Sequence, residues 1–158
     1  MMSSSEEYVW GTSIKKGPIN FTSASFEKKP IQILMKNCKI IYKPNVYQGD
    51  GSETRLNLCL AESGCEEQIK NAETQLDGNV SSCVRDDYIK CKINLKYVTI
   101  YDKDNNKIND TELDWTNLRC HALIHLKGKW ESKTSTGLQL ECTDLQILDK
   151  DVVVSPFA

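Results

Sequence analysis

Two segments of the chain alternate strictly between apolar and polar residues, and this constrains the fold more than any other feature. In residues 88–95 the apolar side consists of Ile89, Cys91, Ile93 and Leu95. In residues 118–127 it consists of Leu118, Cys120, Ala122, Ile124 and Leu126. A period of two is typical of a β-strand with one buried face and one solvent face. The sequence therefore predicts a β-rich protein.

Further strands are expected at residues 31–42, 55–60 and 138–148, and one helix at residues 62–76. The segment 31–42 is apolar on both parities, which suggests burial on both faces over part of its length. Ser63 with Glu66 three residues later resembles a capping box, and Asp77-Gly78 would end the helix. A bulge is expected near Tyr97, where the apolar parity changes. Gly128 would permit a sharp bend.

This count gives five to seven strands, with the helix between the second and third strand groups. We therefore expect a mainly β protein with an OB-fold-like five-stranded barrel and one inserted helix. The barrel would span residues 31–150, after an extended N-terminal arm at 1–30 that could add a strand. Residues 151–158 would form a C-terminal tail that packs on the barrel or joins an edge. A β-sandwich with a decorating helix is the alternative.

The length and charge of the chain limit its partners. Its 158 residues suit one domain, and the net charge of -2 means that a polyanion would have to bind a local patch. No apolar stretch is long enough for a membrane span. The N-terminus lacks the pattern of a secretory signal, so the seven cysteines are expected to be reduced and the protein intracellular, in the cytoplasm or the nucleus. The three sequons at Asn20, Asn79 and Asn109 keep a secreted, disulfide-bonded and glycosylated domain as an alternative.

The C-terminal third carries a specific pattern. The strand Cys120-His121-Ala122-Leu123-Ile124-His125-Leu126 leads into Lys127-Gly128-Lys129-Trp130, followed by a turn ending at Gly137 and by Leu138-Gln139-Leu140-Glu141-Cys142 and Leu145-Gln146-Ile147-Leu148. This resembles the phage-type OB-fold single-stranded DNA-binding proteins of large cytoplasmic DNA viruses. The resemblance implies a protein that coats single-stranded DNA in replication, recombination or repair, with replication proteins as further partners. The acidic C-terminal tail of that family is absent here.

Basic and aromatic residues on the polar side of the predicted strands form the candidate binding surface. Cations follow phosphates and aromatic faces stack on bases, so this combination is typical of single-strand binders. The candidate residues are Lys90, Lys92, Lys96, Tyr97, Arg119, Lys127, Lys129, Trp130 and Lys133. Alternating lysines can also simply solvate the outer face of a strand, and a Trp beside a Gly often serves packing.

Other chemistry finds little support in the sequence. His121 and His125 would lie about 13 Å apart on a strand, too far to share a metal ion. The cysteines have no zinc-type spacing, and no phosphate-binding loop or nucleophile elbow is present. Adjacent Asp86 and Asp87 would point to opposite faces of a strand. We therefore expect a binding protein without cofactor or metal and not an enzyme. The alternative is a protein-interaction or virion structural module, with self-association through an edge strand or the tail.

Overall fold

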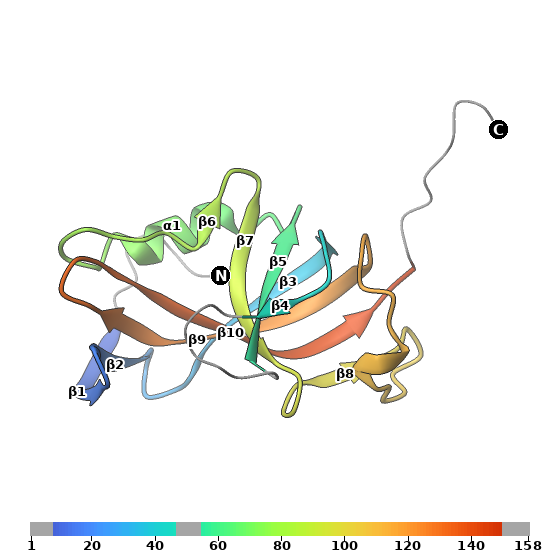
Figure 1. Ribbon diagram of the computed structural model, residues 1–158, viewed down its shortest axis with the longest axis horizontal. Helices are drawn as coiled ribbons and strands as arrows, with labels where there is room; N and C mark the ends of the chain where they lie inside the picture. The colour runs from blue at the N-terminus through green and yellow to red at the C-terminus, as the bar shows by residue number, and fades with distance from the viewer. Residues whose placement is uncertain (1–7, 47–54, 150–158) are drawn as a thin grey trace.

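The computed structural model describes residues 8–46 and 55–149. The main strands are β1 (Val9–Lys16), β2 (Ile19–Ser25), β3 (Ile31–Ile40), β5 (Arg55–Ala61), β7 (Tyr88–Asn94), β9 (Arg119–Glu131) and β10 (Thr136–Ile147). Shorter elements are β4 (Asn45–Val46), β6 (Val84–Arg85), β8 (Thr99–Tyr101), the helix α1 (Glu66–Glu73) and the 3-10 helix η1 (Asp110–Glu112). Figure 1 shows α1 beside one end of a strongly curved sheet.

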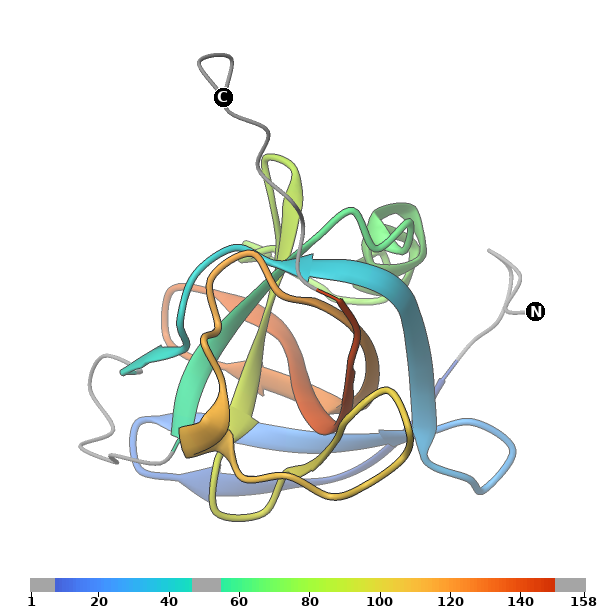
Figure 2. The same ribbon diagram turned by 90° about the vertical axis from the view of Figure 1, so that its right-hand side faces the viewer.

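Five strands pair in a closed ring, in the order β3, β5, β7, β10, β9 and back to β3. Among the pairings of these five described strands, only β7–β10 is parallel. Figure 2 shows the ring from one end. In the chain, α1 follows β5 and precedes β7, the second and third strands of this ring. The predicted mainly β, OB-fold-like arrangement is therefore confirmed.

The interior of the ring is formed by the apolar sides of the alternating strands. Every second residue is buried in β7 from Ile89 onward and in β9 from Cys120 to Gly128. All seven cysteines are free thiols, and Cys38, Cys91, Cys120 and Cys142 are buried. These four act as small apolar side chains in the core, as the sequence pattern indicated.

The strand β3 is not buried on both faces, contrary to the expectation. Ile31, Ile33 and Met35 are buried, while Leu34 is 52% exposed. The register against β9 then shifts between Met35 and Cys38. Asn37, at φ 50°, lies in this bulge. The bulge changes which parity faces the core, and this produces apolar residues on both parities.

The helix is shorter than predicted, and the capping box does not form. Its N-cap is Cys65, without a side-chain cap. The Ser63 hydroxyl instead accepts a hydrogen bond from the Cys65 backbone N–H at 3.2 Å, outside the helix. The expected bulge near Tyr97 is a turn instead, because β7 ends at Asn94 and β8 starts at Thr99. In that turn, the Val98 backbone N–H donates to the Asn94 carbonyl.

The N-terminal segment adds two strands, where one at most was expected. β1 and β2 form an antiparallel hairpin, and β2 pairs with the last part of β9. Gly128 makes this possible, because β9 leaves β3 at Leu126 and pairs with β2 from Gly128 onward. A side chain at Gly128 would lie 2.9 Å from the Ser23 Cα. At the position of the expected bend, β9 thus changes its pairing partner and shifts register against β10. The tail at 151–158 lies outside the described residues.

Candidate nucleic-acid interface

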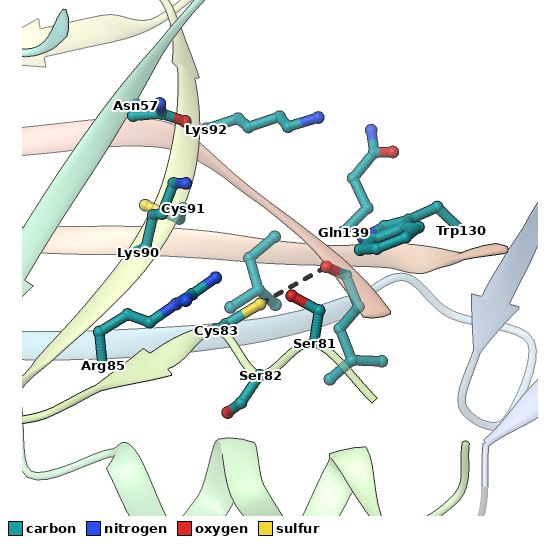
Figure 3. A pocket seen from close by; sticks show the side chains of 12 residues that line it. Asn57, Ser81, Ser82, Cys83, Arg85, Lys90, Cys91, Lys92, Trp130 and Gln139 are labelled. Carbon is teal, nitrogen blue, oxygen red and sulfur yellow. Dashed lines mark hydrogen bonds between the residues drawn. The ribbon is translucent and has the colours of Figure 1, made fainter. Parts of the chain in front are cut away.

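A pocket opens where β7 and β10 diverge. These strands pair only at Lys92 and Ile93 with Glu141 and Cys142, so their starting ends are apart. The chain between α1 and β7 lies over this gap and leaves a cavity of about 260 Å³. Figure 3 shows the cavity and its side chains. Its lining consists of Asn57, Ser81, Ser82, Cys83, Arg85, Lys90, Cys91, Lys92, Trp130, Leu138, Gln139 and Leu140.

The rim segment 79–83 is fixed on both sides. The buried carboxylate of Glu73 in α1 accepts hydrogen bonds from the Ser82 hydroxyl at 2.6 Å and the Cys83 backbone N–H at 2.8 Å. On the β10 side, the Ser81 N–H donates to the Thr136 carbonyl at 2.7 Å. Because both ends are held, the pocket is preformed rather than assembled around a ligand.

Three cations gather at this opening. Lys90 and Lys92 project outward from β7, because the intervening residues fill the core. Arg85 comes from β6, which pairs with the start of β7. No acidic residue lies among the described residues that line the pocket. The opening is therefore locally positive although the whole chain carries a net charge of -2.

Trp130 provides an aromatic wall for the same opening. It faces Gly137 across the β9–β10 pairing, and the absence of a side chain there leaves room for the indole. The ring is only partly buried, and Figure 3 shows it beside Gln139 at the edge of the cavity. Trp130 thus packs on the hairpin and still presents surface to the pocket, and its role in stacking on a base stays a prediction.

Asn57 contributes an unused hydrogen-bonding atom. Its side-chain Oδ1 is buried and has no partner in the structure. The residue lies on β5, opposite Lys92 of β7. A buried acceptor without a donor costs free energy that a bound donor can recover. The pocket therefore suits a ligand that brings an N–H group as well as negative charge.

The thiols in the pocket are not nucleophiles. Burial and, after it, the nearby Glu73 carboxylate raise the pKa of Cys83 to about 12. The protonated thiol points toward the Leu138 carbonyl at 3.5 Å. Burial also raises the pKa of Cys91 well above the usual value. Only the thiolate form of cysteine is a nucleophile, so these two protonated thiols contribute to packing.

Lys127 lies close to the pocket but is neutralised. Its ammonium forms an ion pair with Glu141, and Glu141 is the register partner of both Lys92 on β7 and His125 on β9. Burial lowers the pKa of His125, and the Lys127 ammonium lowers it further. An imidazole in this position is mainly neutral at pH 7.

The other predicted residues lie elsewhere. Arg119 pairs with Glu62 at 2.6 Å, near the bulge of β3. Lys96 and the 73% exposed Tyr97 lie in the β7–β8 turn, with the ammonium 5.5 Å from the ring centroid. Lys129 lies 4.8 Å from the ring centroid of Trp10. Lys133 is exposed in the turn between β9 and β10. The structure thus brings only Lys90, Lys92 and Trp130 of the predicted set into one pocket.

Arg85, Asn57 and Gln139 were missed by the sequence analysis. Arg85 could have been found from the neighbouring pair Asp86-Asp87. The sequence analysis placed this pair on a strand. Those residues form the turn between β6 and β7, and Asp86 has φ 44°. An Asp-Asp turn before an alternating strand indicates a hairpin. A hairpin would have placed Arg85 opposite Tyr88, beside Lys90.

Two negative findings concern membranes and metals. No helix among residues 8–46 and 55–149 is long and apolar enough to cross a membrane. Within the same residues, no group of three or more His, Cys, Asp and Glu side chains is placed to hold a metal ion.

No family model matches the chain, and no curated protein matches it in sequence. Its fold is shared with the single-stranded DNA-binding protein from bacteriophage Enc34. The C-terminally truncated form of that protein aligns with a TM-score of 0.56 at 12% identity, over 95% of this chain and 99% of that chain. The form in complex with single-stranded DNA gives 0.57 at 10% identity, over 96% and 100%.

Bacteriophage T7 gp2.5, a single-stranded DNA-binding protein, aligns with a TM-score of 0.45 at 12% identity, over 83% of this chain and 97% of that chain. The phage-type fold inferred from the sequence is thus confirmed by the Enc34 structures. The narrower resemblance to proteins of large cytoplasmic DNA viruses stays a prediction.

Proposed function

We propose that this chain is a binding protein that holds single-stranded DNA across the pocket between β7, β10 and the rim segment 79–83. The observation that carries the proposal is the convergence of Arg85, Lys90 and Lys92 with Trp130 at one preformed opening. A protein with the same fold has been solved in complex with single-stranded DNA, which supports the choice of ligand.

In the proposed mechanism the three cations contact successive phosphates while a base stacks on Trp130. Stacking on an aromatic side chain contributes about 1–3 kcal/mol per base and accepts any base, since every base has a π-face. The free Oδ1 of Asn57 can accept an N–H of the base. Because charge and stacking dominate, we expect little sequence preference.

A protein that coats exposed strands in this way would act in viral DNA replication, recombination or repair. The protein would be located where single-stranded DNA accumulates, in the cytoplasm, a viral factory or the nucleus. Replication proteins that work on the same strand would be its further partners. These roles extend the binding proposal, and the shared fold supports them.

Fluorescence anisotropy of a labelled oligo-dT tests the proposal. An oligonucleotide of about 30 nucleotides exceeds the usual site size of one OB fold. We expect binding that weakens steeply with added salt and that duplex DNA does not compete. Absence of binding at low salt, where charge interactions are strongest, would overturn the proposal.

Variants of the pocket separate a specific site from general attraction. Lys92→Ala combined with Trp130→Leu should weaken binding at least tenfold, because one phosphate contact and one stacking contact are lost. Lys36→Ala is the matched control, since Lys36 is exposed on β3 away from the pocket residues. Equal effects of the two changes would contradict a localised site.

A second candidate function is a protein-interaction or virion structural module. Among the described strands, β1 pairs with β2 alone, so its other edge is open. Val9 on this strand is 61% exposed. An open edge can pair with a strand of another chain, including a second copy. A stable oligomer in crosslinking that forms without DNA would support this function, and a monomer at all concentrations would exclude self-association.

A further inference from the structure

The aromatic wall of the pocket continues onto the N-terminal hairpin. β2 places Phe21 directly opposite Trp130 of β9. On the other side, Phe21 is opposite Ile14 of β1. Opposed residues on neighbouring strands project from the same face. Ile14, Phe21, Trp130 and Gly137 therefore form one row across β1, β2, β9 and β10.

This row is accessible and carries its own cation. Ile14 is 57% exposed, and Phe21 is partly exposed. Lys16 lies two residues after Ile14 and so shares its face, and its ammonium is 4.8 Å from the centroid of the Phe21 ring. An aromatic ring with an adjacent cation repeats the combination found in the pocket.

The charges around the hairpin favour a polyanion on this face. Neither β1 nor β2 contains an acidic residue. The nearest acidic residue on β9, Glu131, is opposite Asn20 and so projects from the other face. It is already paired with Lys129 at 3.6 Å. The face that carries Phe21 therefore presents Lys16 without a neighbouring carboxylate on these strands.

We infer that Phe21 and Lys16 form a second base-stacking and phosphate-binding position for single-stranded DNA, one step beyond Trp130. This inference rests on the proposed function and extends the DNA path from the pocket onto β2 and β1. Adjacent strands are about 4.8 Å apart, more than the rise of about 3.4 Å per nucleotide of a stacked strand. Consecutive bases therefore reach Trp130 and Phe21 when the DNA is extended and its bases stack on the side chains in place of each other, while Lys16 moves from the ring to a phosphate.

The test compares the affinities of two lengths of oligo-dT, about 4 and about 16 nucleotides, which bracket the site sizes of OB folds. Phe21→Leu keeps an apolar side chain but removes the aromatic face. We expect it to bind both oligonucleotides roughly fivefold to tenfold more weakly, because two consecutive bases already reach both rings. Phe21→Trp should restore the affinity. Circular dichroism would verify that each variant is folded.

The two adjacent lysines of β1 supply a matched pair. Lys16 and Lys15 are both exposed but project from opposite faces. Lys16→Ala should weaken binding of the longer oligonucleotide, and Lys15→Ala should not. If Phe21→Leu binds both lengths like the wild type while Trp130→Leu binds weakly, the inference is wrong and the proposed function stands. If the wild type binds neither length, both fail.

Discussion

Trp130 and Gly137 face each other across the β9–β10 hairpin, and the indole occupies the space that a side chain at residue 137 would need. A methyl group at Gly137 would lie 2.7 Å from Cζ2 and 2.8 Å from Nε1 of the ring. Real side chains do not approach so closely, so the glycine determines where the indole lies. The pocket wall thus depends on a residue that does not itself line the pocket.

Gly137→Ala is therefore expected to displace the indole and to weaken binding of single-stranded DNA about fivefold. This corresponds to the loss of about 1 kcal/mol of stacking. Anisotropy with oligo-dT measures the effect. In a Trp130→Leu background the same change should have little further effect, because the two residues act through one contact. Additive losses in the double variant would show that Gly137 acts independently of the ring.

The salt dependence of binding should report the cations of the pocket. For single strands, the slope of log K against log salt changes by about 0.7 for each phosphate contact. Replacing Arg85, Lys90 and Lys92 by Ala should therefore reduce the slope by about 2. Lys36→Ala should leave it unchanged. A triple variant with the slope of the wild type would mean that these cations do not contact phosphates.

The sequence predicted the strands best where burial is periodic. Alternation in β7 and β9 gave both the core residues and the outward direction of Lys90 and Lys92, because one face of each strand must meet the core. Deviations from the period were harder to interpret. The bulge of β3 resembled two-sided burial, since a single extra residue exchanges the faces.

The site could be predicted only in part, because the neutralisation of a charge is a tertiary property. Lys127 lies on the polar side of an alternating strand, and the sequence does not show that its ammonium pairs with Glu141 on β10. Arg119 is likewise held by Glu62, 57 residues earlier in the chain. The curvature that opens the pocket depends on where β7 and β10 part, and no local pattern encodes that point.

Glu73 should stabilise both the fold and the pocket rim. Its buried carboxylate accepts two hydrogen bonds from residues 82 and 83. Hydrogen bonds to charged groups contribute about 1.5–3 kcal/mol each, so we expect Glu73→Ala to lower the free energy of unfolding by about 3 kcal/mol. Urea titration measures this loss. Hydrogen exchange at the Cys83 amide should also accelerate, whereas Glu66→Ala on the same helix should leave that amide protected.

Gly128 should be less tolerant of substitution than Gly11, although both lie in strands that pair with β2. A methyl group at Gly128 would meet the backbone of Thr22 and Ser23, which can move only if β2 separates from β9. At Gly11 the methyl group would meet the Ser23 hydroxyl, which can rotate away. Gly128→Ala should cost about 1–3 kcal/mol, and Gly11→Ala less. Thermal unfolding of the two variants compares them, and equal losses would contradict this explanation.

His125 should make the stability of the protein depend on pH below neutrality. Burial and the Lys127 ammonium lower the pKa of His125 from its usual 6.5. The unfolded chain therefore binds a proton more readily than the folded protein. The stabilisation from the neutral imidazole is complete above about pH 6.5 and is lost as the pH falls through the folded pKa.

Denaturant titrations between about pH 7 and 5 should consequently show that the wild type loses stability faster than His125→Gln, which cannot take up this proton. The carboxylates titrate equally in both proteins, so the difference between the curves isolates the imidazole. An NMR titration of His125 should give a midpoint below 6.5. Lys127→Met should raise that midpoint, because the ammonium that disfavours the protonated ring is removed and the Glu141 carboxylate remains. Parallel stability curves with a midpoint at 6.5 or above would show that burial does not hold this imidazole neutral.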